Sequence, residues 1–459
     1  MKKGILYNKE KYEAKNGKLH LFPEKVLQFG TGVLLRGLPD YFIDKANKKG
    51  IFKGSVVVIK STTTGGIIDF EEQDNLYHHV VKGLDKGNEV NEIYENTSIS
   101  RVLIASSQWQ EILELSKSSD LKIVISNTTE AGLVFDEKDT QLIKTPYSFP
   151  GKLLSILWHR WNHFKRNADE YGLVILPTEL IPDNGNVLKK IILDLANLQQ
   201  LPNEFIDWLS ISNDFCNTLV DRIVTGKLPE KEQKQLEESL GYQDHLLITS
   251  EPFALWAIET HKQSTMNQLS FSQADASVIV APSIAKFREL KLRLLNGTHT
   301  FCCALAILLG FETVKEAMAS KDFKKFISQL LENEIAPCVV SDEITPLDIH
   351  QFQNVVLDRF SNPTIEHQWK SIAMNYVEKI KMRNLYLIEK FQSLYNEVPK
   401  HMSVCLAAFF VYQEKLSEEV NIDQFSLSES FNNSVISLIS LIKIKGIQFV
   451  MNEFINAKD

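Results

Sequence analysis

The feature that most constrains the fold of this chain is Gly30-Thr31-Gly32, a glycine loop that follows a short apolar run. That run, residues 26–29, predicts a strand, and leucines then recur at helical spacing before the helix stop Lys48-Lys49-Gly50. A β-branched run at residues 55–59 predicts a buried strand. Residues 26–59 therefore predict a strand–helix–strand unit, which belongs in an α/β sheet with parallel strands.

The glycine loop is typical of a dinucleotide site, because glycine allows a tight turn and a close approach of the backbone to a diphosphate. The helix that follows would offer free N–H groups to the phosphates. Gly30 and Gly32 fit the first two glycine positions of such a loop, but Leu35 occupies the third and Gly37 comes two residues late. We predict that residues Phe29–Gly32 bind a dinucleotide; the alternative is a glycine turn in an unrelated α/β domain.

The second strand leaves the choice between NAD and NADP open. An NAD site often carries an acidic residue at the end of this strand, where it bonds the ribose hydroxyls. Here the strand ends at Ile59-Lys60, with no carboxylate nearby. Lys60 can accommodate a 2′-phosphate, or it can be a solvated strand end.

The rest of the chain divides into two halves of different character. Further strands are expected at residues 101–105, 121–126 and 172–176, with helices at 152–164 and 187–198. From about residue 251 onward most segments have helical periodicity, notably 323–331, 369–394, 402–415 and 434–452. We therefore expect an α/β N-terminal Rossmann-type domain with a parallel sheet over residues 1–245. A mainly α-helical C-terminal domain is expected over residues 246–459.

Composition excludes several classes of protein. The net charge of the 459 residues is -8 with no dominant Lys/Arg run, which argues against nucleic-acid and anionic-membrane binding. The longest apolar stretches, residues 301–309 and 404–412, are far shorter than the roughly 20 residues of a membrane span. None of the five cysteines forms a C-x-x-C pair, and the vicinal Cys302-Cys303 is expected to pack in the core. These features favour a cytoplasmic protein; oligomeric state is left open.

The sharpest group of chemically active residues is Lys291, Asn296 and His299. Oxidising an alcohol without a metal needs a base for the hydroxyl proton and donors that stabilise the oxygen. A lysine can be that base where burial or a cationic neighbour lowers its pKa from about 10.4. Asn296 and His299 can donate to the oxygen, and as i and i+3 on a helix they share a face.

The spacing also raises a difficulty. Lys291 stands eight residues before His299, which is roughly 12 Å along an α-helix. A substrate would therefore have to lie between these residues, or the helix would have to bend near Asn296-Gly297. The alternative interpretation is a cationic helix start followed by an ordinary core helix.

Taken together, the glycine loop and Lys291-x-x-x-x-Asn296-x-x-His299 resemble the mannitol dehydrogenase, or polyol-specific long-chain dehydrogenase, family. Four further segments contribute to the resemblance: residues 72–77, 220–223, 251–253 and 359–363. The resemblance implies a Rossmann-type domain, a helical C-terminal domain and an NAD-dependent oxidoreductase that uses no metal. It also implies that Lys291 is the general acid/base and that Asn296 and His299 bind the reacting oxygen.

Within this family the chain most resembles the tagaturonate reductases, also called altronate oxidoreductases. The resemblance rests on residues 28–32, 126–130 and 179–181. Leu180 stands where the mannitol enzymes carry an oxyanion-site asparagine, which disfavours a simple polyol. Interconversion of D-tagaturonate and D-altronate with NAD(H) is thus implied. The alternatives are a fructuronate/mannonate or mannitol oxidoreductase, and a non-catalytic sugar-acid sensor, which would need no base.

Other residues are assigned roles by position. Asn127 and Thr128 follow an apolar strand and are expected at the cofactor, because ligands of open α/β sheets bind beyond the carboxyl ends of strands. Glu130 and Asn184 are expected at the substrate, the latter from an Asn-Gly pair that the family shares. The alternatives are a polar loop for residues 127–130 and a simple turn at Asn184.

A sugar acid also requires cations for its carboxylate. Lys379 and Arg383 are i and i+4 on an expected helix and are candidates for this role; a solvated basic face is the alternative. His159 and His163 share a helix face but have no third ligand nearby in the sequence. We therefore predict no metal site.

Overall fold

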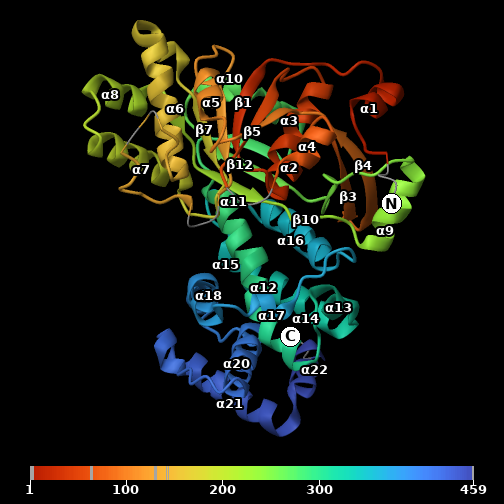
Figure 1. Cartoon of the computed structure of the whole chain (residues 1–459). Helices are drawn as coiled ribbons and strands as arrows, with labels where there is room; N and C mark the ends of the chain where they lie inside the picture. Colours follow the sequence, from red (N-terminus) through yellow and green to blue (C-terminus); the bar gives the residue numbers. More distant parts are fainter. Residues whose placement is uncertain (1–4, 63–65, 129–131, 141, 143, 457–459) are drawn as a thin grey trace. The chain divides into compact units, whose positions relative to one another are not determined.

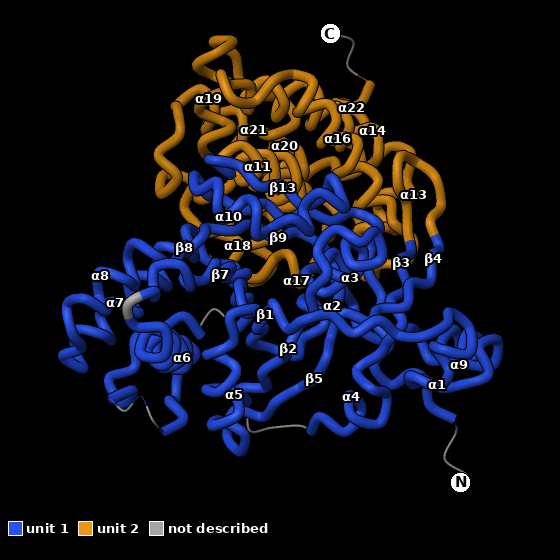
Figure 2. Tube along the Cα trace, turned by 90° about the horizontal axis from the view of Figure 1, so that it is seen from above, with its two compact units in different colours: residues 1–82, 91–284 blue, residues 83–90, 285–459 orange. Residues whose placement is uncertain are grey.

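The computed structural model describes residues 5–62, 66–128, 132–140, 142 and 144–456 and divides the chain into two compact units (Figure 2). Unit 1 comprises Met1–Lys82 and Asn91–Ile284, and unit 2 comprises Gly83–Val90 and Ala285–Asp459. This division lies later than the boundary expected at residue 245. The reason is that residues 248–281 contribute three strands, two of which pair with earlier strands of unit 1.

A six-stranded parallel sheet forms the centre of unit 1 (Figure 1). In spatial order its strands are β5 (Ile99–Ile104), β2 (Ser55–Lys60), β1 (Glu24–Phe29), β6 (Ile123–Ser126), β7 (Val174–Pro177) and β8 (Asp214–Phe215). The chain builds outward from β1 to β2 and β5, and then returns to the other side of β1 for β6, β7 and β8. The strand order therefore reverses between β1 and β6, which is where such sheets bind ligands.

The predicted unit at residues 26–59 is confirmed, with one difference in its helix. The expected single helix is two helices, α2 (Val33–Gly37) and α3 (Pro39–Lys48). The break falls before Pro39, which has no N–H to continue the hydrogen-bond ladder. Strands β1 and β2 pair in parallel, with Val26 opposite Val56.

Helices cover both faces of the sheet. On one face α5 (Trp109–Leu115), α6 (Phe149–Phe164) and α7 (Asn184–Leu198) share a buried core with the sheet. On the other face α2 and α3 pack against the remaining buried side chains of the strands. Strands β2, β6 and β7 are buried along their whole length, which explains the continuous apolar runs in the sequence.

Two smaller sheets and several helices complete unit 1. One sheet has the order β10 (Val224–Gly226), β11 (Ile248–Ser250), β3 (Tyr77–Asp85), β4 (Asn88–Asn96), and the other β13 (Val278–Ala281), β12 (Leu255–Glu259), β9 (Thr218–Asp221). The remaining helices are α1 (Lys9–Asn16), α4 (Ile68–Glu72), α8 (Asn203–Ile211), α9 (Glu230–Leu240) and α10 (Gln263–Gln268), with 3₁₀ turns at Lys165–Tyr171 and Ser270–Ala274.

Unit 2 is helical, as expected. It begins with α11 (Ala285–Leu290), a π-helical segment (Lys291–Gly297) and α12 (Thr298–Leu308), which run on as one continuous helix. Its other α-helices are α13 (Val314–Ala319), α14 (Lys321–Gln329), α15 (Ala336–Val339), α16 (Pro346–Phe360), α17 (Trp369–Ile372), α18 (Tyr376–Arg383), α19 (Leu385–Tyr395), α20 (Lys400–Lys415), α21 (Glu429–Lys445) and α22 (Ile447–Asn456). A second π-helical segment (Leu330–Ile335) and a 3₁₀ turn (Ile422–Phe425) complete the unit.

Two helices expected to be long are divided. The helix expected over residues 369–394 is α17, α18 and α19, because Asn375 has a left-handed backbone (φ 54°) and the chain breaks again at Asn384. The helix expected over residues 434–452 ends at Gly446 (φ 85°) and restarts as α22. Periodicity predicted the buried faces, but single residues in rare backbone conformations divide the helices.

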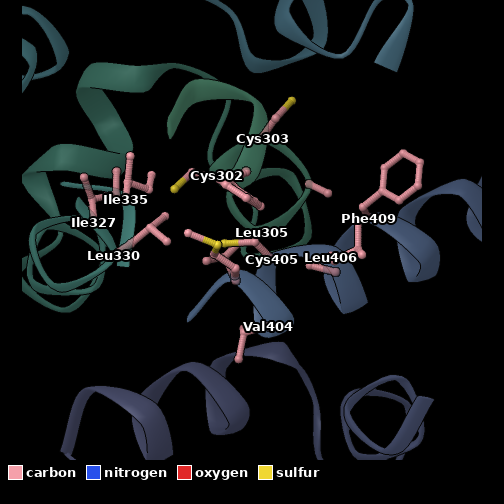
Figure 3. Close-up of a cluster of buried hydrophobic side chains, with 14 of the residues drawn as sticks. Cys302, Cys303, Leu305, Ile327, Leu330, Ile335, Val404, Cys405, Leu406 and Phe409 are labelled. Carbon is pink, nitrogen blue, oxygen red and sulfur yellow. The ribbon is translucent and has the colours of Figure 1, made fainter. Parts of the chain in front are cut away.

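The core of unit 2 lies around α12 and α20 (Figure 3). Cys302 and Cys303 of α12 and Cys405 of α20 are fully buried among leucine, isoleucine and phenylalanine side chains. All five cysteines are free and buried, so the packing role expected for the vicinal pair is confirmed.

No single described helix has the length and apolarity of a membrane span; α21 and α22 reach them only jointly, across a 120° bend. Within the same residues, no three His, Cys, Asp or Glu side chains are grouped so as to hold a metal ion.

Candidate active site

In unit 1 the candidate cofactor residues gather at the carboxyl edge of the sheet. The Gly30 amide donates to the Ile59 carbonyl over 3.0 Å, and the Asn127 amide donates to the Phe29 carbonyl over 3.2 Å. The loops after β1 and β6 therefore lie side by side at the point where the strand order reverses. This is the position that the sequence predicted for a dinucleotide.

The two glycines of the loop are needed for different reasons. Gly30 has φ 127°, and a Cβ there would lie 2.9 Å from Leu35 Cδ1 and 3.2 Å from the Asn127 carbonyl. Gly32 has an ordinary φ of -64°, and a Cβ there would meet no protein atom within 4 Å. The chain's own packing thus requires Gly30, whereas the open space at Gly32 suits the close approach of a diphosphate.

Gly37 takes over the packing role of the third glycine. A Cβ at Gly37 would lie 2.8 Å from Val224 Cγ2 on β10. In dinucleotide-binding loops the third glycine allows a helix to pack closely on a neighbouring element. The two-residue delay seen in the sequence therefore does not remove that function.

Gly32→Val is expected to weaken NADH binding by more than it changes the free energy of unfolding. The added side chain would enter the space beside the loop without striking the protein. Titration of NADH fluorescence and chemical denaturation of the same variant would measure both quantities. An unchanged dissociation constant would show that the loop has been misassigned.

The side chains of Phe29 and Asn127, two other expected cofactor residues, contact other parts of the protein. The Phe29 ring is fully buried against Phe149, with ring centroids 4.8 Å apart, so only its backbone can reach a ligand. The Asn127 side chain donates to the Thr178 carbonyl over 2.9 Å. Thr31 lies half-buried in the loop between Gly30 and Gly32.

Glu179 is a residue that the sequence did not single out for this loop. Its Oε1 accepts the Thr128 amide at 2.9 Å and the Thr128 hydroxyl at 3.0 Å, and its Oε2 accepts the Ser126 hydroxyl at 3.2 Å. Burial raises the pKa of this carboxyl, although these hydrogen bonds oppose the rise. Glu179 therefore fixes the loop after β6, and only tertiary packing reveals it.

The expected substrate residues of unit 1 receive little support. Asn184 is buried, and its amide donates to the Pro177 and Glu179 carbonyls, each at 3.0 Å, while its oxygen accepts the Thr218 amide at 2.9 Å. These bonds leave no free donor for a substrate, so Asn184 holds the turn after β7 instead. Glu130 lies outside the described residues. Leu180 is 65% exposed and supplies no polar group.

Lys60 is not the solvated strand end considered above. It is only 5% exposed, and its Nζ donates to the backbone carbonyl and hydroxyl of Thr62. The ammonium group is therefore held within the turn that follows β2.

In unit 2 two of the three candidate catalytic residues lie in a π-helical segment, Lys291–Gly297. In an α-helix, residues five apart point roughly 140° away from one another. A π-helix bonds each residue to the one five positions along, so residues five apart share a face. Lys291 and Asn296 span this interval within the π-helical segment. His299 follows three residues later on α12, again on a shared face.

Contacts with neighbouring helices stabilise this unusual segment. Arg293 Nη1 donates to the Met382 and Arg383 carbonyls at 3.1 and 3.0 Å, which ties the π-helix to the end of α18. Asn384 Nδ2 donates to the Gly297 carbonyl over 3.0 Å. Side chains thus satisfy the Gly297 carbonyl of the π-helix and two carbonyls at the end of α18.

His299 is held among aromatic rings. It stacks on Phe360 at a centroid distance of 4.0 Å, and His367 meets it edge-on at 5.1 Å. Burial lowers the pKa of His299 well below its ordinary value, and nearby basic groups lower it further, so the ring is neutral at neutral pH. Those groups are His367, Arg359, Arg383 and Lys379.

Two polar side chains at this site, His299 and Asn296, have hydrogen-bonding atoms that the described residues do not use. Within the described part of the chain, the buried Nε2 of His299 has no hydrogen-bond partner. The half-buried Asn296 side chain likewise makes no hydrogen bond to a described residue. Buried polar atoms in folded proteins are nearly always bonded, so the Nε2 of His299 indicates a ligand oxygen.

Lys379 and Arg383 lie on α18 as expected, and both are half-buried, unlike the exposed Lys381 between them. Lys379 Nζ donates to the Ile372 carbonyl over 2.8 Å, and Arg383 Nη1 donates to the Thr300 hydroxyl over 3.1 Å. Neither forms an ion pair with a described carboxylate, and Arg383 Nε is buried without a partner among these residues. Lys379 and Arg383 are therefore partly enclosed by the protein and do not form a fully solvated basic face.

Arg359 and His367 join this group without having been predicted for it. Arg359 lies within a segment that contributed to the family resemblance, so that signal was present but had no role attached. His367 is a single histidine outside any motif, and nothing in the sequence near it indicates its neighbours.

Comparisons with known proteins show matches over most of the chain. Residues 24–270 match the model of the mannitol dehydrogenase Rossmann domain, and residues 283–438 match that of the mannitol dehydrogenase C-terminal domain. An altronate oxidoreductase of Halalkalibacterium halodurans is 40% identical over 398 residues, covering 86% of this chain and 76% of that protein. One of Bacillus subtilis is 36% identical over 407 residues, covering 88% and 83%.

Solved structures show the same fold at low sequence identity. A D-sorbitol dehydrogenase in substrate-free form has a TM-score of 0.78 at 18% identity, covering 98% of this chain and 97% of that one. Pseudomonas fluorescens mannitol 2-dehydrogenase, in a ternary complex with NAD and D-mannitol, has a TM-score of 0.67 at 20% identity, covering 95% of each chain. The expected fold and resemblance are confirmed by two family models that together span most of the chain. This chain belongs to the mannitol dehydrogenase family.

Proposed function

We propose that this chain is a cytoplasmic, NAD-dependent altronate oxidoreductase that interconverts D-tagaturonate and D-altronate. The relatives named altronate oxidoreductase support the reaction. The observation that carries it is the pair of half-buried cations, Lys379 and Arg383, which have no described carboxylate partner and lie near His299. A neutral sugar gives such a pair nothing to neutralise, whereas a sugar acid brings one carboxylate.

The cofactor assignment rests on unit 1. The parallel sheet, the order reversal beside β1 and the open space at Gly32 fit a dinucleotide. NAD is favoured over NADP because Lys60, the cation considered for a 2′-phosphate, is buried and bonded to Thr62. When bound, the cofactor supplies or accepts the hydride.

The chain's own residues transfer the proton and bind the reacting oxygen. Lys291 is assigned the proton transfer: it protonates the ketone oxygen during reduction and takes the proton back in oxidation. Asn296 and the neutral His299 hold that oxygen with their unused donors while charge develops on it. The π-helical segment supports this assignment, because residues five apart in a π-helix lie roughly on one face, and Lys291 and Asn296 are five apart.

Arg383→Met is expected to raise the KM for a keto-uronate by about 10–100-fold, the scale of a hydrogen bond to a charged group. NADH binding should not change, because Arg383 belongs to unit 2 and the cofactor loop to unit 1. Lys379→Met tests the second cation, and Lys381→Met is the matched control, since Lys381 is exposed on the same helix and pairs with Glu378. Equal KM values in all three variants would show that neither Arg383 nor Lys379 binds the substrate carboxylate.

The proposed reaction is tested by the loss of NADH and NADPH absorbance with a panel of keto-uronates and neutral ketoses. We expect tagaturonate with NADH to be the preferred pair, and fructuronate and fructose to be poorer substrates. Assays with EDTA should give the same rates; activity that is lost and then restored by zinc would contradict a metal-free mechanism. A preference for fructose over every uronate would refute the assignment to sugar acids.

A further inference from the structure

His367 occupies a fixed position in the group of cations around His299. It lies between α16 and α17, where its carbonyl accepts the Val314 amide at 2.9 Å. The next residue, Gln368, pairs with Thr313 in an antiparallel bridge. The backbone is thus held on both sides of the histidine, and the ring meets His299 edge-on at 82°.

The imidazole ring of His367 has no hydrogen-bond partner among the described residues. It is half-buried, and neither of its nitrogens forms a hydrogen bond with a residue that the structure describes. A histidine held in a structural role usually bonds a backbone carbonyl or a carboxylate, as His401 does with Glu334 at 2.8 Å. His367 resembles a group that is positioned for a ligand.

The surroundings of the ring are cationic. The groups that face it are Arg359 at the end of α16, Lys379 on α18 and His299 on α12. Burial lowers the pKa of His367, and Arg359 and Lys379 lower it further, so the ring is neutral in the free protein at neutral pH. Among the described residues, no acidic group contributes to the lowered pKa of His367. A bound anion would therefore raise this pKa.

We propose that His367 is a specificity-determining residue that donates a hydrogen bond to the carboxylate of the sugar acid, beside the cations Lys379 and Arg383. This inference rests on the proposed function and assigns a new contact in the same site. A keto-uronate carries its ketone and its carboxylate on one short carbon chain. The groups that hold them must be close neighbours, as His299 and His367 are at 5.1 Å.

The contact has a consequence for pH dependence. A carboxylate beside the ring favours its protonated form, so substrate binding takes up a proton from solvent. The KM for the keto-uronate should therefore rise as pH increases above the pKa of His367 in the free protein. The KM for a neutral ketose should not follow this trend, because a neutral ketose has no carboxylate.

His367→Phe keeps an aromatic ring against His299 but removes both nitrogens. We expect the KM for tagaturonate to rise about 10–100-fold, with kcat and the KM for a neutral ketohexose such as D-tagatose changed less than about threefold. His367→Asn restores a donor that cannot be protonated, so part of the affinity should return without the pH dependence. His350→Asn is the matched control, because His350 is exposed on α16 and contacts only Asn354 among described side chains.

The outcomes separate this inference from the proposed function. If the wild-type protein prefers a neutral ketose over every keto-uronate, both are overturned. If the wild-type protein prefers tagaturonate and His367→Phe keeps that preference and its pH dependence, only the role of His367 is overturned. Equal losses toward charged and neutral substrates would show a structural role and would likewise overturn it.

Discussion

Lys291→Ala is expected to lower kcat by about 10²–10⁴-fold, the usual effect of losing a general acid/base. The variant should bind NADH normally, because the glycine loop lies in unit 1 and Lys291 in unit 2. The π-helix should also survive, since Arg293 and Asn384 supply its cross-links and alanine is a good helix former. Steady-state rates and NADH titration would measure the two quantities.

The control for this variant lies on the same helix. Lys286 pairs with Asp348 at 2.7 Å near the start of α11, so Lys286→Ala removes a lysine without touching the proposed chemistry. Its kcat should stay close to that of the wild-type protein. In Lys291→Ala a small primary amine should restore part of the rate of alcohol oxidation. Near wild-type turnover would place the base elsewhere, with His299 as the first candidate.

Asn296→Ala is expected to raise the activation barrier by about 3 kcal/mol, the effect of losing one oxyanion donor. The loss should fall mainly on kcat, because charge on the substrate oxygen is greatest in the transition state. The side chain makes no hydrogen bond within the described part of the chain, so its removal should change the free energy of unfolding little. Rates and a denaturation curve on the same preparation test both statements.

Two further variants sharpen this test. Asn296→Asp preserves the shape of the side chain but opposes a negative oxygen, so it should be slower than Asn296→Ala. Asn354→Ala removes an exposed asparagine of α16 and should leave kcat unchanged. A rate loss of less than threefold in both Asn296 variants would exclude this residue as an oxyanion donor.

The local patterns of the sequence predicted the elements of unit 1 well. The strands at residues 26–29 and 55–59 and the glycine loop between them follow from adjacent residues, because burial on both faces demands β-branched runs and a tight turn demands glycine. The order Lys291, Asn296, His299 likewise gave the candidate chemistry. What spacing could not show was that the helix is π-helical at this point, where it is bonded to Asn384, between α18 and α19, and to backbone carbonyls of α18.

The sequence by itself determined the fold class and the family, because local patterns and short motifs along the chain indicate both. It predicted the dinucleotide loop and the catalytic candidates from the same kind of motif. Tertiary structure alone decided which distant groups meet. It engaged Asn184 in the turn after β7, placed Glu179 behind the loop after β6, and brought His367 edge-on to His299. Such encounters are set by how helices and strands pack, and no periodicity in the sequence encodes them.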